Sequence, residues 1–169
     1  KDYSANIKGA IKYLKSQYTP SSDYREGSTD QAYHGGLLGS DNMYDHAIGT
    51  LALIEALVDL NDPSLKPMTQ DALNLIIRAQ NTERKPQTLD GPVQPGDPTY
   101  GGWRYNPNST SSDISVSGWQ ILTLKAAVNA GFSVPDYVFP AAAGFVRSLQ
   151  GKDDGSFCYD GPGSSGDSC

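Results

Sequence analysis

An internal repeat constrains the fold of this chain more than any other feature of its sequence. Gln80 recurs as Gln150, 70 residues later, and the segment 43–80 has a second copy at 113–150. A partial copy precedes them and ends at Gln17, 63 residues before Gln80. A fixed period of this size is typical of proteins in which each repeat is one small unit and neighbouring units share a core.

The repeat predicts a single domain over residues 1–169 with three units, at about 1–20, 41–105 and 111–160. Within each unit the apolar residues recur at spacings of three and four, which is one face of a helix. We therefore expect an all-α fold in which Gly- and Pro-rich loops join the helices. The expected helices cover about 3–19, 42–60, 64–80, 113–129 and 135–150.

These helices fall into two kinds. The second and the fourth are apolar on nearly all faces, which predicts that they are buried between neighbours, whereas the third and the fifth are amphipathic and so peripheral. Asp41 and Asp113 are suited to cap the second and fourth helices, and Gly131 to end the fourth. Pro135 is suited to the first turn of the fifth.

Two segments between the helices are predicted loops. Residues 21–40 are polar and Gly-rich. The segment 81–113 contains five prolines and surrounds Gly101-Gly102-Trp103. It is much longer than an ordinary connection, so we expect it either to be functional or to pack on itself.

Charge excludes some classes of partner. The 169 residues contain 13 Lys and Arg against 19 Asp and Glu, a net charge of −6, which repels nucleic acid and anionic lipid surfaces. The richest apolar stretch, 47–60, contains Glu55 and Asp59, and no run approaches the roughly 20 apolar residues of a membrane-spanning helix. We expect a soluble protein that binds neither nucleic acid nor membrane.

The two cysteines favour an oxidising compartment. Cys158 and Cys169 lie in a tail rich in Gly, Ser and Asp, where a disulfide is the natural pairing and two free thiols are the alternative. Asn108 begins a glycosylation sequon. The first residue is Lys1, which fits a processed chain, a fragment or a sequence lacking its leading residues. Together these features predict a secreted, extracellular or periplasmic protein.

Several stretches resemble one known family. They are Met43-Tyr44-Asp45-His46-Ala47, Leu51 to Ala56, Gln80-Asn81, Gly101-Gly102-Trp103-Arg104-Tyr105, Asp113 to Val116, Asn129-Ala130-Gly131 and Val134-Pro135. In these residues the chain is similar to the prenyltransferase and squalene-cyclase repeat proteins, especially to uncharacterised bacterial members. The resemblance implies a partial α/α toroid of about five to six helices, in which inner and outer helices alternate and a Gln-to-Trp motif closes each unit.

The catalytic groups of that family are not matched here. Class II terpene cyclases use the middle Asp of an Asp-x-Asp-Asp motif as proton donor, and the resemblance aligns Ser112 with that donor and Asp113 with the last Asp. A serine hydroxyl is far too weak an acid for this role. The protein prenyltransferases hold zinc through Asp, Cys and His, but both cysteines lie in the tail and the histidines are only His34 and His46. We expect no metal and no cofactor.

Two residues are weak candidates for catalysis. His46, at the start of an inner helix, could act as an acid, a base or a ligand contact, or it could be a packed histidine bonded to a loop carbonyl. Asp113 could be a residual catalytic carboxylate, or the N-cap of its helix.

Aromatic and cationic residues are the candidates for ligand or partner contact. Trp103, Arg104 and Tyr105 could stack on a sugar or meet a protein, with Tyr44, His46 and Trp119 as further contacts. Alternatively, the tryptophan seals a helix end and Arg104 bridges to a carboxylate.

The array has too few helix pairs to close a toroid, so the inner helices should keep exposed apolar flanks. The chain is therefore either part of a larger toroid or completes its packing as a homo-oligomer. We predict a secreted, non-catalytic α/α-repeat module for binding or self-assembly. The alternative is a terpene-cyclase-like or carbohydrate-active toroid enzyme, present here as a fragment of a larger chain.

Overall fold

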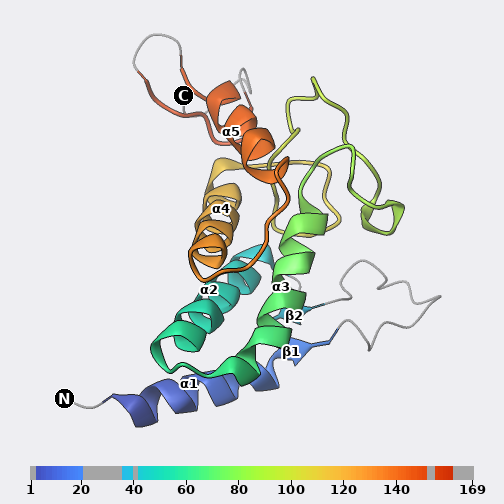
Figure 1. Ribbon diagram of the computed structural model, residues 1–169. Coiled ribbons are helices and arrows are strands. Elements are labelled where there is room, and N and C mark those ends of the chain that lie inside the picture. Colours follow the sequence, from blue (N-terminus) through green and yellow to red (C-terminus); the bar gives the residue numbers. More distant parts are fainter. Residues whose placement is uncertain (1–2, 21–35, 40–41, 152–154, 162–169) are drawn as a thin grey trace.

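The computed structural model describes residues 3–20, 36–39, 42–151 and 155–161, and this part of the chain is mainly helical. Its five α-helices lie where the sequence predicts helices (Figure 1). Short 3-10 helices precede α3 and interrupt the following loop. The bounds are α1 Ser4–Ser16, α2 Met43–Asp59, η3 Pro63–Leu65, α3 Lys66–Ala79, η4 Gln87–Leu89, α4 Ile114–Asn129 and α5 Val138–Ser148.

One small sheet was not predicted. β1 (Tyr18–Thr19) pairs antiparallel with β2 (Leu37–Leu38), with Tyr18 opposite Leu38. Strands of two residues are too short to show an alternating pattern in the sequence. The sheet joins the end of α1 to the segment that leads into α2.

The capping predictions were partly right. Asp113 caps α4, because its Oδ1 accepts the Val116 N–H at 2.8 Å. Asp41 was the wrong cap for α2 and lies outside the described residues; the extended residue Asn42 takes this place and accepts the Tyr44 N–H at 2.8 Å. α5 begins at Val138, so Pro135 precedes its first turn.

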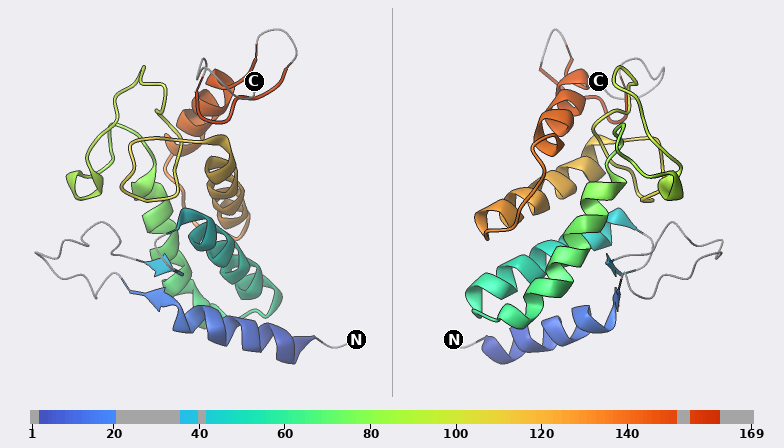
Figure 2. Two further views of the ribbon diagram at one scale, coloured as in Figure 1. Left: turned by 180° about the vertical axis from the view of Figure 1, so that it is seen from behind. Right: turned by 45° about the vertical axis from the view of Figure 1, so that its right-hand side comes forward.

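α2 lies at the centre of the array and contacts α1, α3 and α4. It runs parallel to α4, because Gln120 Nε2 donates to the Met43 carbonyl at 2.8 Å and Thr123 Oγ1 donates to the Ala47 carbonyl at 3.0 Å. In the views of Figures 1 and 2, α1 and α5 lie at opposite ends. The two most apolar helices are therefore neighbours, as the sequence predicts.

The amphipathic helices flank this pair. α3 buries its apolar face, including Leu73 and Ile76, in the same core cluster as Met43 of α2 and Leu124 of α4. α1 is different, because Ile11 is its only buried residue. Most of α1 therefore lies outside the core.

The repeat is visible in the backbone. Gly36 and Gly101 both adopt positive φ, at 89° and 94°. A Cβ at either would lie 2.2 Å from the Asp71 carbonyl oxygen or 2.1 Å from that of Ala141, respectively, so both close approaches require glycine. Asp71 and Ala141 are 70 residues apart, as the sequence period predicts. The N-caps Asn42 and Asp113 are 71 apart, so the inner helices match with one residue more.

Candidate functional site

The Gly101 to Tyr105 segment and residues 155–159 form two similar connections. The Tyr105 carbonyl accepts the Met43 N–H of α2 at 2.8 Å, and the Tyr159 carbonyl accepts the Ile114 N–H of α4 at 2.9 Å. Each tyrosine therefore satisfies a free amide at the start of an inner helix. Because the two helices are neighbours, the tyrosine side chains come together.

These side chains form a short aromatic row. The rings of Tyr44 and Tyr105 stack with centroids 5.8 Å apart, and the hydroxyls of Tyr105 and Tyr159 lie 2.5 Å apart. The hydrogen bond with Tyr159 raises the pKa of Tyr105 to about 12. Tyr105 is therefore neutral at physiological pH.

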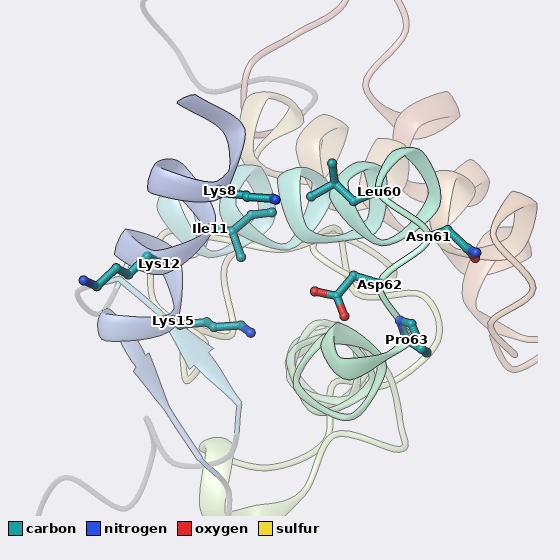
Figure 3. Close-up of a pocket in the computed structure, with 8 residues that line it drawn as sticks. All are labelled: Lys8, Ile11, Lys12, Lys15, Leu60, Asn61, Asp62 and Pro63. Carbon is teal, nitrogen blue, oxygen red and sulfur yellow. The ribbon is translucent and has the colours of Figure 1, made fainter. Parts of the chain in front are cut away.

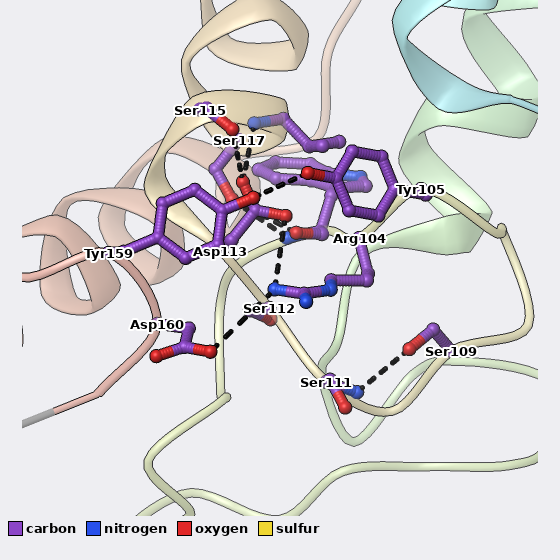
Figure 4. Close-up of polar contacts among 12 residues, drawn as sticks. Arg104, Tyr105, Ser109, Ser111, Ser112, Asp113, Ser115, Ser117, Tyr159 and Asp160 are labelled. Atoms are coloured by element: carbon purple, nitrogen blue, oxygen red, sulfur yellow. Dashed lines mark hydrogen bonds and ion pairs between the residues drawn. The ribbon is translucent and has the colours of Figure 1, made fainter. Parts of the chain in front are cut away.

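Arg104 lies against this row (Figure 4). Its guanidinium carbon is 5.1 Å from the Tyr105 ring centroid and 5.6 Å from that of Tyr159. Its Nη1 is 3.4 Å from Oδ2 of Asp113 and 4.0 Å from Oδ2 of Asp160. The arginine thus bridges a carboxylate, as one of the two interpretations predicts.

Asp113 is fully buried beneath Arg104. Its Oδ1 accepts from the Ser115 hydroxyl at 2.6 Å as well as from the Val116 amide, and its Oδ2 faces the guanidinium. Both oxygens therefore have structural partners. This geometry agrees with the capping interpretation of Asp113.

His46 is also fully buried, and both ring nitrogens have partners. Nδ1 accepts the Leu38 N–H at 3.1 Å, and Nε2 lies 3.0 Å from the Ala72 carbonyl, so the proton is assigned to Nε2. Burial lowers the pKa of His46 to about 4 and keeps the ring neutral. One unit later, the Ser117 hydroxyl accepts the Trp103 N–H at 2.9 Å in the same way. His46 occupies a position that anchors backbone in both units.

Trp103 closes the end of α3. Its side chain is buried, and Nε1 donates to the Ile76 carbonyl in the last turn of the helix at 2.8 Å. Gln80 does not bond its own helix end, as we expected; its Nε2 donates to the carbonyls of Gly101 and Val138. The pair ties three segments together, and Trp103 presents no face to a ligand.

The long loop packs on itself. Lys85 is buried and donates from Nζ to Asn81 Oδ1 at 2.8 Å and to the Ser109 carbonyl at 2.6 Å, and burial lowers its pKa to about 8. Asn81 in turn donates to the Ser111 carbonyl. Asn108 is half-buried on this loop, and use of the sequon stays a prediction.

The tail supplies one described cysteine. Cys158 is buried and packs with Phe145 and Leu149 of the α5 region. Cys169, like His34, lies outside the described residues. The disulfide between the two cysteines stays a prediction.

The exposed candidates lie on the inner helices. Trp119 on α4 is 36% exposed and is followed by Leu122, 50% exposed. Ile48 on α2 is 44% exposed. Sequence reasoning selected Trp119 but missed Leu122, Ile48 and Tyr159. The exposed apolar residues could have been found from the all-round apolar character of helices that have too few neighbours.

Two hollows recur between successive outer helices. The larger, of about 600 Å³, has Lys8 and Lys15 of α1 on one side and Asp62 on the other (Figure 3). Its counterpart between α3 and the start of α5 is lined by Arg78 and Ser133 among others. Because they recur, these hollows follow from the repeat.

Within the part of the chain that the structure describes, no group of three His, Cys, Asp or Glu residues could hold a metal ion. No helix among the described residues has the length and apolar character needed to cross a membrane. No protein-family model, curated protein or solved structure matches the chain. Function must therefore be inferred from the geometry described above.

Proposed function

We propose that this chain is a secreted α/α-repeat module, part of a toroid related to the prenyltransferase and squalene-cyclase repeats, that binds or assembles through its inner helices. The exposed apolar side chains of α2 and α4 carry the proposal. Ile48, Trp119 and Leu122 belong to the two most apolar helices, yet all three are more than a third exposed. Contiguous apolar surface of this kind is typical of interaction sites.

A binding role agrees with the state of the two catalytic candidates. His46 is neutral and buried, with both ring nitrogens engaged by backbone groups. The Asp113 carboxylate caps α4 and faces Arg104. An enzymatic function would need at least one of these groups to reach a substrate, so the toroid-enzyme alternative has less support.

Sedimentation velocity of the native preparation tests the proposal. We expect a species larger than the 18.1 kDa chain, or a co-purifying partner. The double variant Trp119→Ser, Leu122→Ser should then sediment as the isolated chain. Phe157→Ser is the matched control, because this exposed aromatic lies outside the inner helices. A stable monomer without any partner would contradict the proposal.

A further inference from the structure

A third hollow differs from the two that recur. It is a groove of about 450 Å³ between α1 and the face of α2 that lies away from α4. The residues that shape it are Leu14 and Gln17 of α1, Leu38 of β2, and Ile48, Gly49 and Ala52 of α2.

The next unit contains the same groove, but a helix fills it. Counterparts are matched by the terminal glutamine of the outer helices, the glycine of the close approach and the N-cap of the inner helices. They are Ile77, Gln80, Trp103, Trp119, Gln120 and Thr123. Gln120 and Thr123 donate to backbone carbonyls of α2, and Trp103 shares a buried cluster with Met43 of α2. α2 is therefore the occupant of the second groove.

We propose that the groove beside α1 holds a single inner-type helix, parallel to α2, which the same polypeptide supplies ahead of α1. In the repeat, each outer helix follows its own inner helix, as α3 follows α2 and α5 follows α4. α1 is an outer helix, so its inner helix belongs before it. This inference rests on the proposed repeat and names the partner of its free α2 face.

A whole second copy fits this groove poorly. If α4 of another copy took the place beside α2, its α5 would have the position that an outer helix takes in this unit. α1 already has that position. The described array begins and ends with an outer helix, so copies placed head to tail would have one outer helix too many.

α1 carries surface for the same occupant. Its apolar stripe continues from Ile11 through Ile7 to Tyr3, and both Ile7 and Tyr3 are exposed. An outer helix normally buries such a stripe against its inner helix, as α3 does with Leu73 and Ile76. The missing helix would cover both the stripe of α1 and the free face of α2.

The charge along α2 describes the end of the occupant. Ile48, Ala52, Glu55 and Asp59 form an exposed stripe with helical spacing. The counterparts of Glu55 and Asp59 on α4 are Ala126 and Ala130, which line a hollow together with Ile54 of α2. The occupant should therefore carry Lys or Arg where α2 has Ile54. A cation in the last turn of a helix also suits the helix dipole.

A chimera tests this proposal. Residues 42–65 are duplicated and joined to Tyr3, so that a copy of α2 with its natural connector stands before α1, with Ile54→Lys in the added copy only. We expect the Tm to rise by about 5 °C and ANS fluorescence to fall, because apolar surface becomes buried. The lysine should make part of the rise sensitive to salt.

Two controls make the result specific. The same chimera with Ala52→Arg in the original α2 has a blocked groove and should lose the rise in Tm. Ala52→Arg in the natural chain should leave Tm unchanged, as should Ala5→Arg, because both alanines are exposed. Equal Tm values for the open and blocked chimeras would overturn the proposal. A natural dimer that Ala52→Arg dissociates would also overturn it, because the occupant would then be a second copy.

The two proposals can fail separately. If the chimera is stabilised but neither it nor the natural chain binds or assembles, the helix seat stands and the binding function fails. If association depends on Trp119 and Leu122 while the chimera gains nothing, the function stands and the helix seat fails.

Discussion

The chain builds the junction between an outer helix and the next inner helix twice, once around Gly36 to Gly39 and once around Gly101 to Tyr105. In both, a glycine with positive φ lies against a carbonyl of the next outer helix. In both, the amide two residues later donates to a side chain on the inner helix, His46 in the first junction and Ser117 in the second.

The side chains around these shared backbone contacts differ. The second junction has Trp103 and Arg104 where the first has Leu38 and Gly39. Only the second therefore has a tryptophan that closes an outer helix and an arginine that pairs with an N-cap carboxylate. The comparison teaches that backbone geometry defines the junction, while aromatic and charged groups adapt each one to its neighbours.

Substitution of the shared glycines should have the largest effect. Gly101→Ala places a Cβ 2.1 Å from the Ala141 carbonyl oxygen at positive φ, which should lower the free energy of unfolding by about 4 kcal/mol. Gly36→Ala meets the Asp71 carbonyl in the same way and should cost a similar amount. Urea unfolding followed by circular dichroism measures both.

Gly118→Ala is the control for these variants, because a Cβ at this exposed helical position meets nothing within 4 Å. It should raise stability by about 0.5 to 1 kcal/mol. A mild effect of Gly101→Ala combined with a severe one of Gly36→Ala would show that the two junctions are not equivalent.

Trp103→Leu converts the second junction toward the first and should cost about 3 kcal/mol. The variant leaves a cavity in the core and removes the hydrogen bond to Ile76. Trp119→Leu, on the exposed side of α4, should change the free energy of unfolding by less than about 0.5 kcal/mol. Equal costs for the two tryptophans would contradict the assignment of Trp103 as a core residue.

The helices and their order could be predicted from the sequence because apolar spacing and the repeat both report on buried faces. The inner helices α2 and α4 were recognisable because they are apolar on most sides. The two-residue strands and the role of Asn42 as cap could not be predicted. Both depend on where the chain returns after a long loop, and local pattern does not contain that information.

The site was predicted in part. The capping role of Asp113 and the pairing of Arg104 with a carboxylate follow from residue type and position. The contribution of Tyr159 was missed, although the spacing of Gly155, Phe157 and Tyr159 matches that of Gly101, Trp103 and Tyr105. Extending the repeat comparison into the tail would have placed Tyr159 beside Tyr105.

The first junction should be sensitive to pH in a way that the second is not. The pKa of His46 is about 4 in the folded chain and 6.5 as an ordinary histidine, so the unfolded chain binds the proton more tightly. Stability from this group is complete above pH 6.5 and falls as pH decreases toward 4, by about 2 to 3 kcal/mol. Unfolding by urea at several pH values should show this loss.

Carboxylates also titrate in the lower part of this range, so the useful quantity is the difference between His46→Gln and the natural chain. Since the amide does not titrate, the variant should lack the loss between pH 6.5 and 5. Parallel curves for the two proteins would show that His46 does not control the acid stability of the junction.

The ion pair at the second junction should give the smallest effect. Arg104→Met leaves the buried Asp113 carboxylate without its cation and should cost about 1 to 2 kcal/mol. Asp113→Asn keeps a side chain that can cap α4, and in this background Arg104→Met should cost about 1 kcal/mol less. Lys12→Met, on the exposed surface of α1, is the control and should change stability by less than about 0.5 kcal/mol. If Arg104→Met costs the same with Asp or Asn at position 113, the arginine stabilises the junction through the tyrosine rings instead of the carboxylate.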